Sequence, residues 1–104
     1  MQSTKVRVPV DREKIAEFCR ANHVRKLAFF GSVLRDDFRS DSDVDVLIEF
    51  EPNHVIGFIK LYGVEQQLSN LLQGHRPDLV NPKFLNRRIR DRVLAEAEVQ
   101  YAQG

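Results

Sequence analysis

Residues 44–50, with the sequence VDVLIEF, constrain the fold of this chain more than any other segment. Alternate side chains of a strand point to opposite faces, so this segment predicts a strand with one wholly apolar face. That face consists of Val44, Val46, Ile48 and Phe50. The opposite face starts with two carboxylates, Asp43 and Asp45, followed by Leu47 and Glu49. An unpaired charge within an apolar strand is costly, so we interpret Asp45 as a functional residue.

The rest of the chain alternates between helix and strand signals. Apolar residues spaced three and four apart, together with end signals, predict helices. The predicted helices run from an N-cap at Asp11 to Asn22, over residues 56–73 with Gly74 at C′, and over residues 86–101. The other predicted strands span residues 26–30 and 76–81, and Ser32 is expected to cap a single turn through Arg35. This order predicts a small α/β or α+β domain with a three-stranded sheet.

The length of 104 residues predicts a single domain over residues 1–104. No apolar run approaches the roughly 18 residues of a membrane span, and residues 1–10 lack the apolar core of a secretory signal. A lone cysteine, Cys19, excludes an internal disulfide framework, and its place on an apolar helix face predicts an inert core thiol. We therefore expect a cytoplasmic protein with no membrane contact.

Charge is unevenly distributed, although the net charge is only +1. Residues 36–51 hold seven acidic residues and one base, whereas residues 76–92 hold six bases and two acids. An acidic middle beside a basic last helix is typical of a cation site near an anion-binding surface. In that helix, Leu85, Ile89 and Val93 are expected to face the core, with the arginines directed outward.

Several familiar catalytic and metal-binding motifs are missing from the sequence. It contains no Walker-type phosphate loop, dinucleotide-binding glycine motif, zinc-protease motif or nucleophile elbow. The three histidines, His23, His54 and His75, lack the sequence spacing of metal ligands, which favours ordinary surface positions.

A Gly-Ser pair, followed after ten residues by Asp-x-Asp, remains as the chemically informative pattern. Gly31 would let the backbone approach a phosphate, and Ser32 would supply a hydroxyl and an N–H group. Asp43 and Asp45 are hard oxygen ligands suited to Mg²⁺ bridging a triphosphate. The pattern therefore predicts a site for phosphoryl transfer.

The segment FGSVLRDDFRSDSDVDVLIEF resembles the signature of minimal nucleotidyltransferases in the DNA polymerase β-like superfamily. The downstream segment RPDLVNPKFLNRRIRDRVLAEAEVQYA is similar to that family's third-carboxylate strand and closing helix. The resemblance implies a mixed sheet flanked by helices. It also implies that two Mg²⁺ ions are held by Asp43, Asp45 and Asp78, with Asp78 helping to deprotonate the acceptor. The nucleotide phosphates would be held by Gly31, Ser32 and Arg35.

These roles imply a Mg²⁺-dependent nucleotidyltransferase that moves AMP from ATP to a hydroxyl group. The resemblance further implies an antitoxin that adenylylates a helical HEPN-type toxin partner in a hetero-oligomer. No direct binding to a nucleic-acid template is expected. Two alternatives stay open. One is a non-catalytic antitoxin that acts by occlusion, which Asp36 favours because it adds a negative charge close to the expected triphosphate-binding turn. The other is the catalytic subunit of a small-molecule nucleotidyltransferase.

Overall fold

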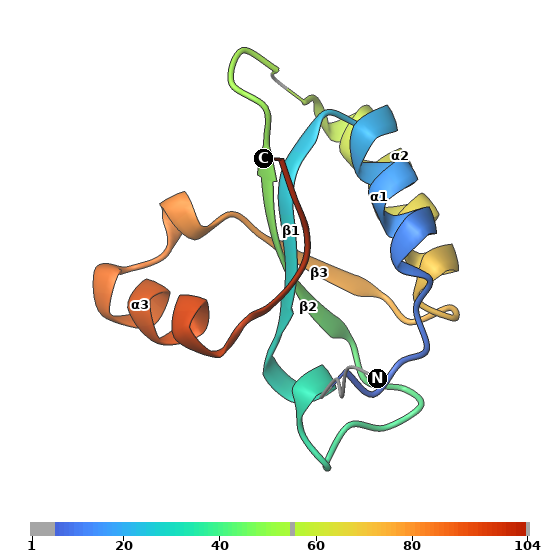
Figure 1. Cartoon of the computed structure of the whole chain (residues 1–104), viewed down its shortest axis with the longest axis vertical. Coiled ribbons are helices and arrows are strands. Elements are labelled where there is room, and N and C mark those ends of the chain that lie inside the picture. Colours follow the sequence, from blue (N-terminus) through green and yellow to red (C-terminus); the bar gives the residue numbers. More distant parts are fainter. Residues whose placement is uncertain (1–5, 55, 104) are drawn as a thin grey trace.

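The computed structural model describes residues 6–54 and 56–103. Within these ranges the chain forms a four-stranded sheet with helices on both sides (Figure 1). The elements in chain order are α1 (Arg12–Ala21), β1 (Val24–Phe30), the 3₁₀ turn η1 (Gly31–Leu34), β2 (Val44–Phe50), α2 (Phe58–Leu71), β3 (Pro77–Val80), the 3₁₀ turn η2 (Pro82–Phe84), α3 (Arg87–Glu96) and β4 (Glu98–Ala102). The mixed α/β class expected from the sequence is confirmed.

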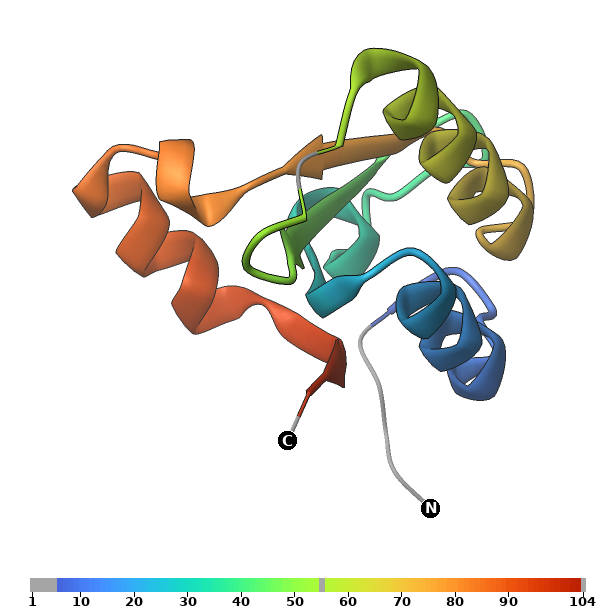
Figure 2. The same ribbon diagram turned by 90° about the horizontal axis from the view of Figure 1, so that it is seen from above.

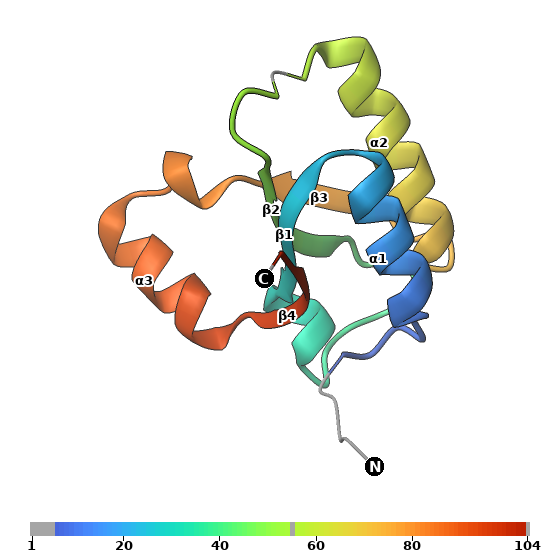
Figure 3. The ribbon, with the colours of Figure 1, turned by 45° about the horizontal axis from the view of Figure 1, so that its top comes forward.

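The strands lie in the order β3-β2-β1-β4. Strand β1 is antiparallel to both β2 and β4, whereas β2 and β3 run parallel. Helices α1 and α2 lie side by side against one face, and α3 lies on the other side of the sheet (Figures 2 and 3). The two faces therefore have different surroundings, one packed and one more open.

The hydrophobic core lies between the sheet and the α1–α2 pair. The apolar face predicted for β2 supplies buried residues to it, among them Val46 and Ile48. Helix α1 adds Ile15, Phe18 and Cys19. Cys19 is fully buried, and burial raises the pKa of its thiol to about 12, so the thiol stays protonated at neutral pH. This agrees with the predicted core position.

The two core helices begin and end near their predicted boundaries. The Asp11 carboxylate caps α1, as predicted, because it accepts hydrogen bonds from the N–H groups of Glu13 and Lys14 at 3.0 and 3.3 Å. Helix α2 ends at Leu71, two residues before the predicted end, with Leu72 as its C-cap. The C′ position is therefore left-handed Gln73 (φ 59°), and the predicted Gly74 (φ 88°) comes one residue later. Among the described helices, none is long and apolar enough to cross a membrane.

The last third of the chain differs most from the prediction. Helix α3 ends at Glu96, and residues 98–102 form a fourth strand, so the expected helix to Tyr101 and the three-stranded count were wrong. Residues 93–101 are rich in Ala, Glu and Gln, which favour helices. The strand also lacks an apolar alternation, because Gln100 is buried while Val99 is 42% exposed. Pairing with β1 overrides the local preference.

Helix α3 buries none of its side chains, contrary to the expected inward apolar stripe. Ile89 is 51% exposed, and the neighbouring Phe84 in η2 is 82% exposed. The helix leaves β3 on one edge of the sheet and returns to β4 on the other edge, so it crosses the open side of the sheet without packing closely (Figure 1).

Candidate active site

The candidate site is centred on the contact between Asp45 and Gly31. In the antiparallel β1–β2 pair, Phe30 lies opposite Asp45, and Gly31 follows directly after β1. Gly31 has a φ of +75°, and an added Cβ would overlap the Asp45 Oδ2 atom. Only glycine satisfies both the left-handed backbone and this close approach. The Gly-Ser pair and the Asp-x-Asp pair of the sequence are therefore adjacent in space.

The two remaining carboxylates come from the neighbouring backbone. Parallel pairing places Asp78 of β3 beside Asp45 of β2. Asp43 lies just before β2, where the Val44 N–H donates to the Arg76 carbonyl at 2.9 Å and fixes the strand entry. Asp45 is partly buried, whereas Asp43 and Asp78 are exposed. The structure thus brings the three predicted carboxylates to one end of the sheet, although among the described residues their oxygen atoms do not all lie within 4.8 Å of one another.

The electrostatics of Asp45 reflect this arrangement. Burial raises the pKa of Asp45 above its ordinary value, and the nearby Asp78 and Asp43 carboxylates raise it further. Asp78 also accepts a hydrogen bond from the protonated form of Asp45, while the positive charge of Arg35 acts in the opposite direction. Placing three carboxylates together therefore costs free energy of folding at neutral pH. Such a cost is typical of a site that binds a cation.

The turn η1 places Ser32 and Arg35 next to these carboxylates. Ser32 lies inside the turn, with no side-chain cap at its start, so the predicted capping role was wrong. Its carbonyl accepts the Arg35 N–H at 2.9 Å. The Arg35 guanidinium is exposed and lies 3.4 Å from the Asp37 carboxylate. Arg35 is therefore accessible to a ligand from solvent.

A cavity of about 410 Å³ lies between η1 and the end of α3. Gly31, Leu34 and Arg35 line it from one side, and Ala95 and Glu96 line it from the other. The sequence analysis missed Ala95 and Glu96, because the predicted continuous helix gave no reason for α3 to end beside η1. The cavity opens a space for a small molecule next to Gly31.

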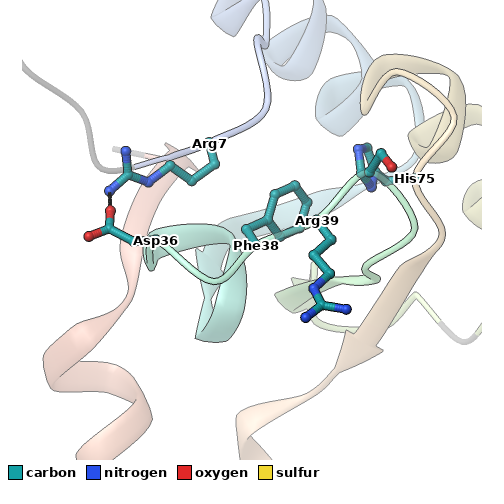
Figure 4. Close-up of a pocket in the computed structure, with 6 residues that line it drawn as sticks. Arg7, Asp36, Phe38, Arg39 and His75 are labelled. Atoms are coloured by element: carbon teal, nitrogen blue, oxygen red, sulfur yellow. Dashed lines mark hydrogen bonds and ion pairs between the residues drawn. The ribbon is translucent and has the colours of Figure 1, made fainter.

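The extra acidic residue Asp36 has a cationic partner. Its carboxylate forms an ion pair with the Arg7 guanidinium, which is drawn as a dashed line in Figure 4. This pair lines a second cavity of about 320 Å³, together with Phe38, Arg39 and His75. The charge that Asp36 adds near η1 is therefore offset locally.

The donor set of the three aspartates fits a hard divalent cation. Mg²⁺ prefers carboxylate oxygens and keeps several water ligands, which exposed carboxylates such as Asp43 and Asp78 allow. A cation would also favour the ionised form of Asp45, whose pKa is raised by burial and by the two neighbouring carboxylates. The residues present are thus compatible with the Mg²⁺ site expected from the sequence.

Comparisons with known proteins found related sequences and folds. A family model described as a nucleotidyltransferase domain matches residues 12–100. Over 73 residues the chain is 40% identical to protein adenylyltransferase MntA of Thermococcus cleftensis, an alignment that covers 70% of this chain and 71% of the relative. A solved structure described as a candidate minimal nucleotidyltransferase is 34% identical, with a TM-score of 0.68, and covers 84% of this chain and 86% of that chain.

A more distant neighbour has the same fold. It is a chain in the structure of a tri-AMPylated Shewanella oneidensis HEPN toxin in complex with an MNT antitoxin. That chain is 19% identical, with a TM-score of 0.60, and the match covers 88% of this chain and 70% of that one. Because the family model spans most of the chain, the resemblance to minimal nucleotidyltransferases is confirmed, and the chain belongs to the nucleotidyltransferase domain family.

Proposed function

We propose that this protein transfers AMP from ATP to a hydroxyl group on a helical HEPN-type protein and acts as its antitoxin. The observation that carries the proposal is the convergence of Asp43, Asp45 and Asp78 beside the glycine turn η1 and its cavity. The relative named protein adenylyltransferase supports the reaction type, and the AMPylated toxin complex supports the class of partner.

The three aspartates have separate roles in this proposal. Asp43 and Asp45 would hold two Mg²⁺ ions together with Asp78, and the ions would stabilise negative charge on the attacking and leaving oxygens. Asp78 is the more exposed member of the β2–β3 pair, so it is the better placed to meet an acceptor arriving from solvent. Its carboxylate would accept the proton of the acceptor hydroxyl.

The reaction is a substitution at the α-phosphorus of ATP. The acceptor oxygen forms a bond to this phosphorus, the bond to the bridging oxygen of the β-phosphate breaks, and pyrophosphate leaves. The proton of the hydroxyl goes to Asp78. Gly31 leaves room for a phosphate at the backbone, and the exposed Arg35 supplies a positive charge next to it.

Helix α3 is the surface best suited to the protein partner. It buries none of its own side chains, and it borders the cavity through Ala95 and Glu96. Ile89 and Leu94 are 51% and 42% exposed, which gives the helix apolar area for contact. Four arginines lie on the same helix, and none of them forms an ion pair within the described chain: Arg87, Arg88, Arg90 and Arg92.

Co-expression of the protein with a HEPN-type partner, followed by intact-mass spectrometry of both chains, tests the proposal. We expect the mass of one or more AMP groups on the partner, and no addition when Asp43→Asn and Asp45→Asn are combined. A matched control is Glu17→Gln, which changes an exposed acid on α1, the helix on the other face of the sheet.

Two results would contradict the adenylylation. A stable complex with an unmodified partner would favour the occlusion alternative. Modification of a small molecule in place of the partner would favour the small-molecule alternative.

A further inference from the structure

His23 and His54 lie together in the structure, although 31 positions separate them in the sequence and they were expected to be unrelated surface histidines. The antiparallel pairing of β1 and β2 places Val24 opposite Phe50, so the residues just outside these strands meet. His23 precedes β1, and Glu51 and His54 follow β2. Their imidazole rings are stacked, with centroids 3.9 Å apart and an interplanar angle of 11°.

The Glu51 carboxylate lies close to the imidazole rings of both His23 and His54. Its Oε1 atom lies 3.5 Å from His23 Nδ1 and 3.7 Å from His54 Nε2. Within the described part of the chain, this is the one group of three metal-capable side chains whose ligand atoms all lie within 4.8 Å of one another. Bonds of about 2.05 Å around a tetrahedral zinc ion place neighbouring ligand atoms roughly 3.4 Å apart. The two measured separations are close to that value, and the two imidazole nitrogens lie within 4.8 Å of each other. Because the stacked rings are nearly parallel, both must rotate for their in-plane nitrogen lone pairs to meet at one ion.

The backbone holds these three side chains in place. The Glu51 N–H donates to the His23 carbonyl at 2.8 Å, and the His54 N–H donates to the Glu51 carbonyl at 3.2 Å. His23 and Asn53 both adopt left-handed backbone angles, with φ of 57° and 72°. Such angles are uncommon for residues other than glycine, so the turns before β1 and after β2 have well-defined conformations.

A hydrogen bond from Gln103 orients the Glu51 carboxylate. Glu51 Oε2 accepts a hydrogen bond from Gln103 Nε2 at 2.6 Å, which leaves Oε1 directed at the histidines. Gln103 is itself fixed, because its N–H donates to the Arg25 carbonyl at 2.9 Å. Metal sites commonly have an outer hydrogen bond of this kind on a ligating carboxylate.

We propose that His23, Glu51 and His54 form a second metal site, which binds a zinc-like divalent transition metal. Two imidazole nitrogens and one carboxylate oxygen suit Zn²⁺, whereas Mg²⁺ requires oxygen ligands. Glu51 and Asp45 are six residues apart along β2, so the rise of a strand per residue places the site about 20 Å from Asp45. Binding there links the turn before β1 to the turn after β2 and stabilises the fold away from the reaction.

Titration calorimetry with Zn²⁺ as the probe tests this site on an untagged chain with saturating Mg²⁺ present. We expect one Zn²⁺ per chain and a rise in the melting temperature. The variants His23→Asn, Glu51→Gln and His54→Asn should each weaken binding by about tenfold or more. Asparagine tolerates the left-handed backbone at position 23, and circular dichroism verifies that each variant is folded.

Two controls separate this site from other metal-binding groups. His75→Asn removes the remaining histidine, which hydrogen-bonds to the Ser42 carbonyl at 2.7 Å outside the cluster, and should leave Zn²⁺ binding unchanged. The double variant Asp43→Asn and Asp45→Asn should also retain binding. No Zn²⁺ binding, unchanged affinity in all three cluster variants, or loss of binding in the aspartate double variant would each overturn the proposal.

Discussion

The two ends of the β1–β2 pair carry different sets of ionisable side chains. One end, which we call the aspartate end, holds Asp43, Asp45 and Asp78 beside Gly31. The opposite end, which we call the histidine end, holds His23, Glu51 and His54. Burial and the neighbouring carboxylates raise the pKa of Asp45, whereas the hydrogen bond from Gln103 and the two nearby imidazoles lower the pKa of Glu51. The aspartate end therefore carries an unfavourable electrostatic interaction, whereas the ionisable groups at the histidine end have favourable partners within the described chain.

Removal of a carboxylate from the aspartate end should have the largest effect on activity. We expect Asp78→Asn to lower the rate of AMP transfer by roughly a thousandfold or more, because both metal binding and proton acceptance are lost. Single-turnover assays with labelled ATP measure the rate, and Glu17→Gln is the matched control. A variant with Asp78→Asn that reacts as fast as the parent would remove Asp78 from the site.

A methyl group at Gly31 should have the next largest effect. The left-handed backbone and the overlap with Asp45 Oδ2 should make Gly31→Ala destabilising by about 1–2 kcal/mol, with a strong loss of transfer. Urea unfolding measures the free energy. The control is Gly63→Ala in α2, where no atom lies within 4 Å of the added Cβ and alanine should stabilise the helix by about 0.5–1 kcal/mol. Equal changes in the free energy of unfolding for Gly31→Ala and Gly63→Ala would contradict the close contact between Gly31 and Asp45.

Neutralisation of Asp45 should stabilise the fold while it abolishes function. Its raised pKa means that the ionised carboxylate destabilises the folded state, a cost present at neutral pH and lost as the pH falls toward the ordinary value of 3.8. We expect Asp45→Asn to raise the melting temperature in EDTA at pH 7 by on the order of a few degrees. The difference from the parent should disappear near pH 4. If Asp45→Asn melted at a lower temperature than the parent at pH 7, the ionised Asp45 carboxylate would not destabilise the fold.

Surface ion pairs at the two ends should have the smallest effects. Arg25 lies 2.8 Å from Glu49 near the histidine end, and Arg7 pairs with Asp36 near the aspartate end. Arg25→Gln and Arg7→Gln should each change the free energy of unfolding by less than about 1 kcal/mol, because exposed pairs are screened. Urea unfolding at two salt concentrations checks this. A larger loss at either end would show that its ion pair matters for the fold.

The sequence predicted the aspartate end better than the histidine end, for a physical reason. Alternation along residues 44–50 fixes the face on which Asp45 lies, and the resemblance supplied its partners. The contact between His23 and His54 depends on the register of β1 against β2, which no local pattern encodes. Strand β4 was missed because the buried Gln100 and the exposed Val99 reverse the usual alternation.

The pairing of β4 with β1 has a consequence for the order of folding. Leu27 pairs with Ile48 across a short loop, but it also pairs with Tyr101, more than 70 residues away along the chain. Loop-closure entropy favours early pairing of β1 with β2 and delays the arrival of β4. The contact between Gly31 and Asp45 therefore forms early in refolding, whereas the wall of the cavity that α3 contributes is completed late. A ligand of this cavity would therefore require β4 to be paired and α3 to be in place.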